Sequence, residues 1–114
     1  MNRGDIVWVE LPRPATQGRE QFGRRPAIII QDETQFDNTP TVIVVPVTSQ
    51  KAALRFPATV LISPTPNNGL QAESIALVYQ IRAIDRKRVQ QVMGTLEARS
   101  MADINFHLRK IIEL

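Results

Sequence analysis

The sequence predicts a small α+β domain that is mainly β, in which a strongly bent antiparallel sheet or small barrel carries one C-terminal helix. Three observations point to this fold class. With 114 residues, the chain has room for a single domain, 1–114, with one core. Before residue 96, short apolar runs alternate with turns that contain Pro or Gly, as in sheets built from many short strands. Beyond that point the apolar residues recur at the spacing of a helix.

Each expected strand is delimited by its turn residues. Pro26 is expected to start the second strand, because a proline is tolerated easily at a strand's first position. Thr41–Val47 is the most continuous apolar run, which predicts a central strand buried on both faces. The polar segment Asp32–Pro40 is expected to be a solvated connection, and Asn68-Gly69 suits a tight reversal. The expected strands are 5–11, 27–31, 41–47, 56–62, 74–82 and 89–93.

A single apolar stripe predicts the C-terminal helix. Thr95 is the expected N-cap, since a threonine side chain can accept a hydrogen bond from the first turn. Glu97 near the start and Arg109 and Lys110 near the end suit the helix dipole. The stripe consists of Leu96, Met101, Ile104, Leu108, Ile111 and Ile112.

Composition excludes several classes of function. The absence of Cys excludes disulfide scaffolds, thiolate metal sites and cysteine nucleophiles, and the single histidine, His107, cannot form a histidine metal site. We therefore expect no metal and no cofactor; the acidic cluster of Asp32, Glu33 and Asp37 offers the one alternative, metal ligation. No apolar run approaches the length of about 20 residues that a membrane helix needs, and no secretory signal is visible, so we expect a cytoplasmic protein that does not bind membranes.

The cations point to an anionic partner. The net charge is only +3, but eleven of the fourteen cations are Arg, whose planar guanidinium binds phosphate through two parallel hydrogen bonds. A GC-rich genome would produce the same bias. Three polar clusters nevertheless stand out: the loop 18–26, with Arg25 next to a strand start; the segment 46–51 at the exit of the central strand, with the hydroxyls of Thr48 and Ser49; and 79–82, followed by Arg86. Each cluster alone is equally typical of a surface loop or turn.

In this order, the clusters resemble the MazF/PemK family of toxin endoribonucleases, the mRNA interferases of type II toxin–antitoxin systems. Four collinear blocks covering nearly the whole chain carry the resemblance. The blocks are Arg3-Gly4-Asp5-Ile6-Val7-Trp8-Val9; Gly18-x-Glu20-Gln21-x-Gly23-x-Arg25-Pro26-Ala27; Val44-Val45-Pro46-Val47-Thr48-Ser49; and Gln80-Ile81-Arg82-Ala83-Ile84-Asp85.

The resemblance implies an SH3-like barrel of the CcdB/MazF toxin type, a homodimer, metal-independent and sequence-specific cleavage of single-stranded RNA, and a cognate antitoxin. By position, the family's essential arginine falls on Arg25 and its essential hydroxyl on Thr48. Tyr79 departs from the family pattern, in which this position is often acidic, and an aromatic residue here could stack on a base or belong to the core. The RNA-binding residues implied are Arg19, Glu20, Gln21, Ser49, Gln80 and Arg82.

The residues fit cleavage in which the substrate's own 2′-OH attacks the phosphate, leaving a 2′,3′-cyclic phosphate and a 5′-OH. Arg25 would stabilise the phosphorane and Thr48 would bind a phosphate oxygen or the 2′-OH. Glu20 and water are both open as the general base. Two other functions stay open: binding of a protein target such as gyrase, as in CcdB toxins, and an inactive RNA-binding module. The chain ends Ile-Ile-Glu-Leu, without the aromatic end on which the gyrase-binding toxins rely.

Overall fold

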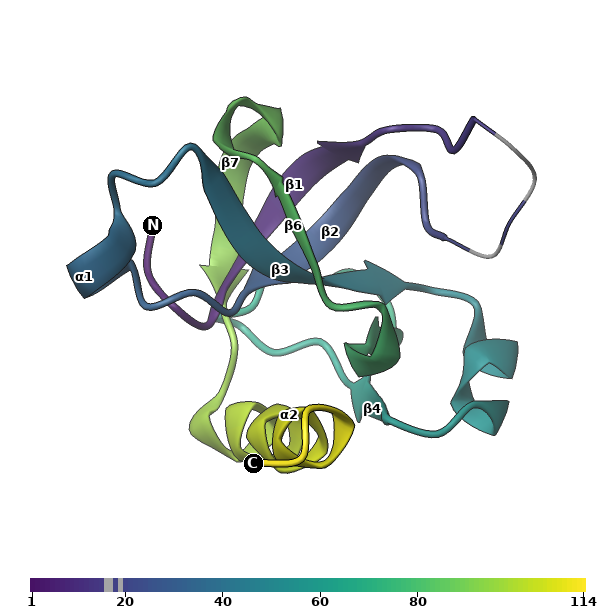
Figure 1. Cartoon of the computed structure of the whole chain (residues 1–114). Coiled ribbons are helices and arrows are strands. Elements are labelled where there is room, and N and C mark those ends of the chain that lie inside the picture. The colour runs from purple at the N-terminus through teal and green to yellow at the C-terminus, as the bar shows by residue number, and fades with distance from the viewer. Residues whose placement is uncertain (16–17, 19) are drawn as a thin grey trace.

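A bent antiparallel sheet packs against one long helix in the computed structural model, which describes residues 1–15, 18 and 20–114 (Figure 1). The strands are β1 (Asp5–Leu11), β2 (Gly23–Ile29), β3 (Thr41–Thr48), β4 (Thr59–Ile62), β5 (Ser74–Leu77), β6 (Arg82–Asp85) and β7 (Val89–Thr95). The helices are α1 (Glu33–Phe36) and α2 (Ala98–Ile111), with 3-10 turns η1 (Lys51–Arg55), η2 (Val78–Gln80) and η3 (Arg86–Arg88). None of the described helices is both long and apolar enough to cross a membrane.

Strand β3 is the centre of the sheet, and it changes partners along its length. On one side it pairs with β2 through residues 44–46. Other partners are β6, through residues 41–44, and β5, through residues 47–48. The main strand order is β4-β5-β3-β2-β1-β7, with β6 added beside β3. The predicted fold class is therefore confirmed, although within the described residues the sheet is strongly bent and does not close into a complete barrel.

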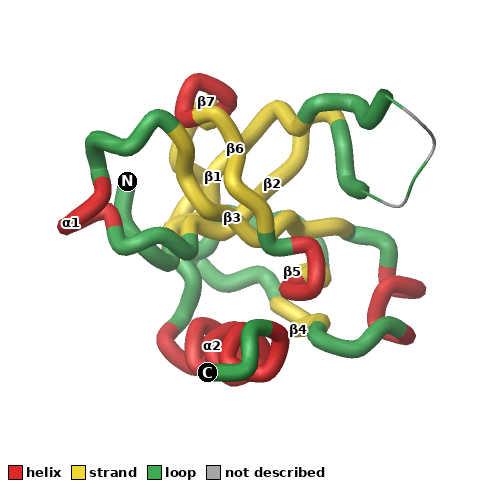
Figure 2. Tube along the Cα trace, viewed as in Figure 1, coloured by secondary structure: helices red, strands yellow, loops and turns green. Residues whose placement is uncertain are grey.

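The core divides between the two faces of the sheet, because successive side chains of a strand point to opposite faces. One cluster joins Ile28 and Val45 to Ile104 and Leu108 of α2. Figure 2 shows α2 lying along this side, next to β4. The other face holds the second cluster, which consists of Val7, Val9, Leu11, Ala27, Ile29, Val42, Val44 and Ile84. The alternation in β1, β2 and β3 thus places apolar residues against both clusters.

Two predicted strand boundaries near the polar clusters are wrong. Strand β2 begins at Gly23 and not at Pro26, because this stretch already pairs with β1, where Pro26 lies opposite Trp8. The proline is tolerated there because the β2–β3 ladder starts only at Ala27. The segment 74–82, predicted as one strand, is divided by η2 into β5 and β6, which pair with different parts of β3.

Three further elements also differ from the prediction. The segment 56–62 is extended only at Thr59–Ile62, and α1 lies within the segment that was expected to be a solvated connection. Helix α2 has Glu97 as its N-cap residue, and Thr95 ends β7 instead. The hydroxyl of Thr95 donates to the Asp5 carboxylate at 3.2 Å, a contact across the sheet that the sequence does not reveal.

Candidate active site

Arg25 and Thr48 lie just beyond the same end of the β2–β3 ladder. The last pair of that ladder is Ala27 with Pro46; Arg25 precedes Ala27 by two residues and Thr48 follows Pro46 by two. Because side chains alternate along a strand, each of the two is on the same face as the nearer member of that last pair. Past this point the strands take different partners: Arg25 pairs with β1 and Thr48 pairs with β5.

The local contacts of this pair leave polar groups available. Thr48 is only 3% exposed, and its hydroxyl oxygen accepts a hydrogen bond from the Gln50 N–H at 3.2 Å, so that its own proton can still be donated. Arg25 is half-buried, and its Nε donates to the Phe22 carbonyl at 3.1 Å. Among the described residues, nothing else bonds its two terminal nitrogens. The backbone contact therefore orients a guanidinium whose forked end is available to an anion.

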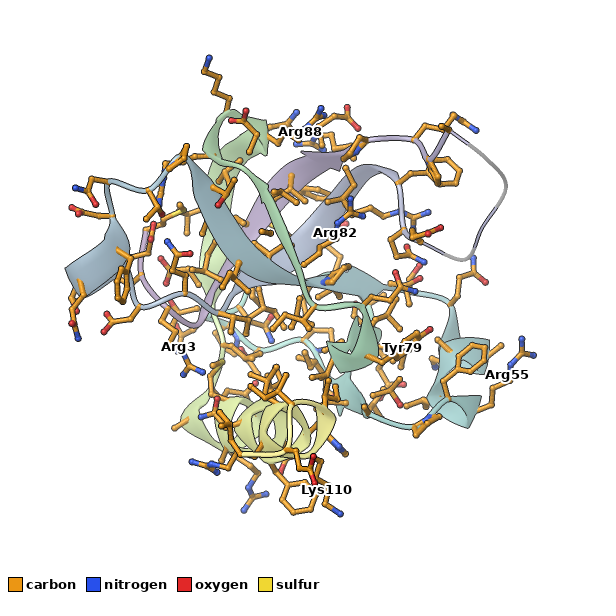
Figure 3. The ribbon with its side chains drawn as sticks, in the orientation of Figure 1. Arg3, Arg55, Tyr79, Arg82, Arg88 and Lys110 are labelled. Carbon is orange, nitrogen blue, oxygen red and sulfur yellow. The ribbon has the colours of Figure 1, made fainter. Side chains whose placement is uncertain are left out.

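The loop before β2 is held by Gln80 and Arg82, two of the residues expected to bind RNA. The Gln21 N–H donates to Gln80 Oε1 at 3.0 Å, and Arg82 Nη1 donates to the Gln21 carbonyl at 3.2 Å. Arg82 is labelled in Figure 3 at the start of β6. Together, these two bonds fix the backbone of Gln21 from both sides, which gives the Gln-Ile-Arg motif a structural role that the sequence did not indicate.

A pocket of about 470 Å³ is lined in part by Gln21 and Gln80. One wall is aromatic: the rings of Phe56 and Tyr79 lie 5.6 Å apart at 55°, and the Arg55 guanidinium lies 4.8 Å from the centre of the Phe56 ring. Figure 3 shows Tyr79 and Arg55 on this side of the molecule. We call this hollow the Tyr79 pocket; its lining residues are Gln21, Thr48, Gln50, Ala52, Ala53, Arg55, Phe56, Leu77, Tyr79 and Gln80.

The sequence-based candidates thus form two adjoining groups. Thr48 belongs to both, since it lies beyond the ladder with Arg25 and also lines the Tyr79 pocket with Gln21 and Gln80. Glu20 and Ser49 are exposed and form no hydrogen bond with another described side chain. Arg19 lies outside the described residues.

The pocket also contains residues that the sequence did not single out. Phe56 was read as the start of a strand, and Arg55 carried no motif. Phe56 follows the short turn η1, so its position beside Tyr79 depends on a contact between segments far apart in the sequence.

The acidic cluster has structural partners instead of a ligand. Glu33 is buried and pairs with Arg86, whose Nη2 lies 3.2 Å from Glu33 Oε2; hydrogen bonds from Arg86 lower the pKa of Glu33. Asp32 caps α1 by accepting from the Thr34 N–H at 3.0 Å, and the hydrogen bonds from Thr34 lower the pKa of Asp32. The expectation of a fully solvated connection is wrong because Glu33 is drawn inward by Arg86. The described residues include no group of three or more acidic or His side chains placed to hold a metal ion.

Comparison with known proteins places these features in a family. The family model for the PemK-like, MazF-like toxin of type II toxin–antitoxin systems matches residues 2–112. The chain belongs to this toxin family. It is 34% identical over 105 residues to endoribonuclease MazF from Staphylococcus saprophyticus, covering 92% of this chain and 85% of that protein.

Solved structures of toxins and endoribonucleases share this fold. A crystal structure of MazF from Deinococcus radiodurans has a TM-score of 0.81 and 24% sequence identity, with 100% of this chain and 97% of that chain covered. An endoribonuclease in complex with its cognate antitoxin, from Mycobacterial species, has a TM-score of 0.73 and 18% identity, with 100% of this chain and 96% of that chain covered. These likenesses show that the bent sheet with its C-terminal helix is the fold of MazF toxins.

Proposed function

We propose that this MazF-like endoribonuclease toxin cuts single-stranded mRNA at a short sequence, without a metal ion, by attack of the substrate's own 2′-OH. The general activity follows from membership of the family and from the curated relative, which is named an endoribonuclease. The chemistry and the sites are the proposal. The observation that carries it is the placement of Arg25 and Thr48 beyond one end of the β2–β3 ladder, with the forked end of the Arg25 guanidinium available.

In the proposed reaction, the 2′-oxygen attacks the adjacent phosphorus while the bond from phosphorus to the 5′-oxygen breaks. The products are a 2′,3′-cyclic phosphate on one fragment and a 5′-OH on the other. The pentacoordinate phosphorane carries more negative charge on its non-bridging oxygens than the ground state does. A guanidinium directed at those oxygens therefore stabilises the transition state more than the bound substrate.

Arg25 is the group proposed to provide this stabilisation. Its Nε bond to the Phe22 carbonyl orients it before substrate arrives, so little reorganisation is needed during the reaction. The buried Thr48 hydroxyl is proposed to donate to a non-bridging oxygen or to orient the 2′-OH. Arginine stays protonated, so it is unsuited to remove the 2′-OH proton; it can donate a hydrogen bond to the departing 5′-oxygen, which takes its proton from water to become the 5′-OH.

The 2′-OH proton passes either to Glu20 or to a water molecule. Glu20 is exposed in the loop before β2, two residues before Phe22, to which Arg25 is anchored. A Glu20→Gln variant separates the two candidates. If Glu20 is the base, the variant loses the acidic limb of the pH dependence of kcat/KM; if water is the base, the shape of the pH profile is unchanged.

We also propose a cognate antitoxin, a homodimer and a cytoplasmic location, where the mRNA substrate is found. The mycobacterial neighbour is described in complex with its cognate antitoxin, which supports the first of these proposals. The resemblance of the sequence to the family supports the second. Equilibrium sedimentation of the purified protein, alone and with the product of a neighbouring small acidic gene, tests both.

The activity test combines a long RNA with two controls on chemistry. We expect cutting at a few fixed sites, undiminished by EDTA and abolished when the nucleotide 5′ of the cut is 2′-deoxy. Arg25→Ala should lower kcat/KM by about 10²–10³, the cost of one donor to a developing oxyanion. Arg109→Ala, in the last turn of α2 and exposed, is the matched control and should cut like wild type.

Four results would contradict parts of the proposal. Loss of cutting in EDTA would show a metal requirement, and cleavage of the 2′-deoxy substrate would exclude attack by the 2′-OH. Binding of RNA without any cutting would favour the inactive RNA-binding module. If neither binding nor cutting occurs, a protein target becomes the better hypothesis.

A further inference from the structure

We propose that the Tyr79 pocket holds the nucleobase of a nucleotide that flanks the cleaved phosphate, with Tyr79 as a stacking surface and Gln21 as a hydrogen-bond acceptor. The inference rests on the proposed function, because it assigns part of the substrate to a place beside the reacting atoms. It gives roles to Tyr79, at a position that departs from the family pattern, and to Phe56, which carries no motif.

The first argument is the chemistry of the wall. A nucleobase presents a flat π-face and a polar edge, and proteins that bind single-stranded RNA use aromatic side chains for the face and polar groups for the edge. The Tyr79 pocket offers both: aromatic rings at Tyr79 and Phe56, small apolar side chains at Ala52 and Ala53, and three amide side chains. Tyr79 is 38% exposed, so its ring is accessible to a ligand.

The second argument is an acceptor that lacks a donor. Gln21 Oε1 is buried, and no donor among the described residues reaches it. Burying an amide oxygen without a hydrogen bond is costly, and Gln21 is one of the residues that line the pocket, so rotation of its side chain toward a bound ligand would give this oxygen a donor. Every nucleobase carries an N–H on its polar edge and can supply it.

The third argument is that Gln21 is held in place. Gln80 accepts from its N–H at 3.0 Å and Arg82 donates to its carbonyl at 3.2 Å. The Gln80 amide also donates to the Tyr79 hydroxyl at 3.4 Å, which links the acceptor to the stacking ring. A backbone fixed on both sides keeps the Gln21 side chain at the pocket, so that ligand binding requires only a side-chain rotation and no movement of the loop.

The fourth argument is position and charge. Thr48 lines the pocket and also lies beyond the ladder end with Arg25, so a base in the pocket belongs to a nucleotide next to the phosphate at Arg25. No carboxylate is among the lining residues that the structure describes, and Arg55 adds a positive charge at the rim. These features suit a polyanion better than an acidic peptide.

The test is a double-mutant cycle in which kcat/KM is measured with and without the Tyr79 side chain and with and without one nucleobase of the substrate. The substrate is a short RNA with a mapped cut, prepared intact and with an abasic nucleotide on either side of the cut. For wild type, removal of the base that occupies the pocket should lower kcat/KM by about 5- to 150-fold, the range measured for a base stacked on an aromatic residue. Tyr79→Ala should show a similar loss on intact RNA and little further loss on the abasic RNA.

Conservative variants guard against a merely structural effect. Tyr79→Phe keeps the ring and should stay within a few-fold of wild type. Gln21→Leu removes the acceptor at nearly constant volume and should also reduce sensitivity to the base. Phe36→Ala, an exposed aromatic of α1 that does not line the pocket, is the matched control and should leave the full base effect. If the loss of kcat/KM from Tyr79→Ala and the loss from removing a base simply multiply, for the nucleotide on either side of the cut, the proposal is overturned.

Binding separates the failure of this inference from failure of the proposed function. The same intact and abasic RNAs, made uncleavable by 2′-deoxy substitution at the cut, can be titrated by fluorescence anisotropy. A base effect on Kd that disappears in Tyr79→Ala supports the pocket even if no RNA is cut. Normal cutting together with no base effect, in either rate or Kd, overturns the pocket and leaves the proposed function intact.

Discussion

Substitution of Arg86 by Ala tests whether this arginine is structural or contacts RNA. The sequence placed Arg86 among cations near the last strands that could steer RNA. In the structure its guanidinium is occupied within the protein: Nε donates to the Thr39 carbonyl at 2.8 Å, and Nη2 donates to the Phe36 carbonyl at 3.1 Å. Both terminal nitrogens also contact the Glu33 carboxylate.

The expected loss of stability follows from the burial of the pair. The Glu33 side chain is 4% exposed and that of Arg86 is 26% exposed, so Arg86→Ala leaves a carboxylate nearly out of water without its cation. Breaking a buried pair in this way costs about 3–5 kcal/mol, and the partial exposure of Arg86 places the value near the lower limit, about 3 kcal/mol. For a domain of this size, that corresponds to a fall in Tm of about 12 °C.

The pH dependence of the stability that Glu33 contributes should have opposite signs in wild type and in Arg86→Ala. In wild type the pKa of Glu33 is lowered from its ordinary value of 4.5, so the unfolded state binds more protons there, and this pair's contribution to stability is lost as the pH falls below about 4.5. In Arg86→Ala, burial without a cation raises the pKa of Glu33 above the unfolded value. The variant should therefore regain stability relative to wild type as the pH falls toward that value.

Thermal and urea unfolding, followed by circular dichroism from neutral pH to pH 4, measures these effects. Glu33→Gln provides the second arm: added to Arg86→Ala, it removes the unpaired charge and should recover part of the lost stability. RNA affinity of the folded variant at low temperature should stay near that of wild type. An unchanged Tm in Arg86→Ala, together with weaker RNA binding, would refute the structural role and indicate that Arg86 contacts RNA.

Two further predictions concern the Thr48 hydroxyl and a glycine whose surroundings leave no room for a side chain. Thr48→Val keeps the shape of the side chain but removes the acceptor for the Gln50 N–H, so it should lower the free energy of unfolding by about 1 kcal/mol and kcat at least tenfold. Thr48→Ser keeps the hydroxyl and should retain most of the activity. Equal rates for the two variants would exclude the hydroxyl from the reaction. Gly94→Ala should destabilise the protein strongly, because the new Cβ would lie 2.3 Å from the Asn67 carbonyl oxygen. Gly23→Ala, at φ +81° but in open space, should lower the free energy of unfolding by only about 1 kcal/mol. Urea unfolding of both variants compares the effect of steric crowding with that of backbone strain.

The sequence predicts the architecture well where local chemistry decides it. Strand β1 is predicted with its observed bounds, and Thr41–Val47 agrees with β3 to within one residue, because long β-branched runs leave few alternatives. The helix α2 follows from its apolar stripe. Its cap was misplaced because Thr95 is used across the sheet by Asp5, a contact between residues far apart in the sequence.

The sequence nominates candidate site residues but does not reveal the contacts among them. Motif positions identified Arg25, Thr48 and Gln21, and the structure places these in two adjoining groups around Thr48. The use of Gln80 and Arg82 to hold the Gln21 backbone could not be predicted, because each hydrogen bond joins segments about 60 residues apart. Phe56 was not identified for the same reason: its aromatic partner is distant in sequence.

The end of the β2–β3 ladder gives a physical reason for the proposal that Arg25 and Thr48, from different strands, bind one phosphate. Within an antiparallel ladder, opposed side chains are packed against the sheet and its neighbours. Pro26 and Pro46 cannot donate backbone hydrogen bonds, so neither supports continuation of the ladder beyond Ala27. Past this point β3 turns to β5 while β2 stays with β1, and the side chains that follow are released from mutual packing but still fixed by their other partners. Side chains on the diverging strands are thereby held by separate partners, an arrangement that suits the preorganised phosphate site proposed above.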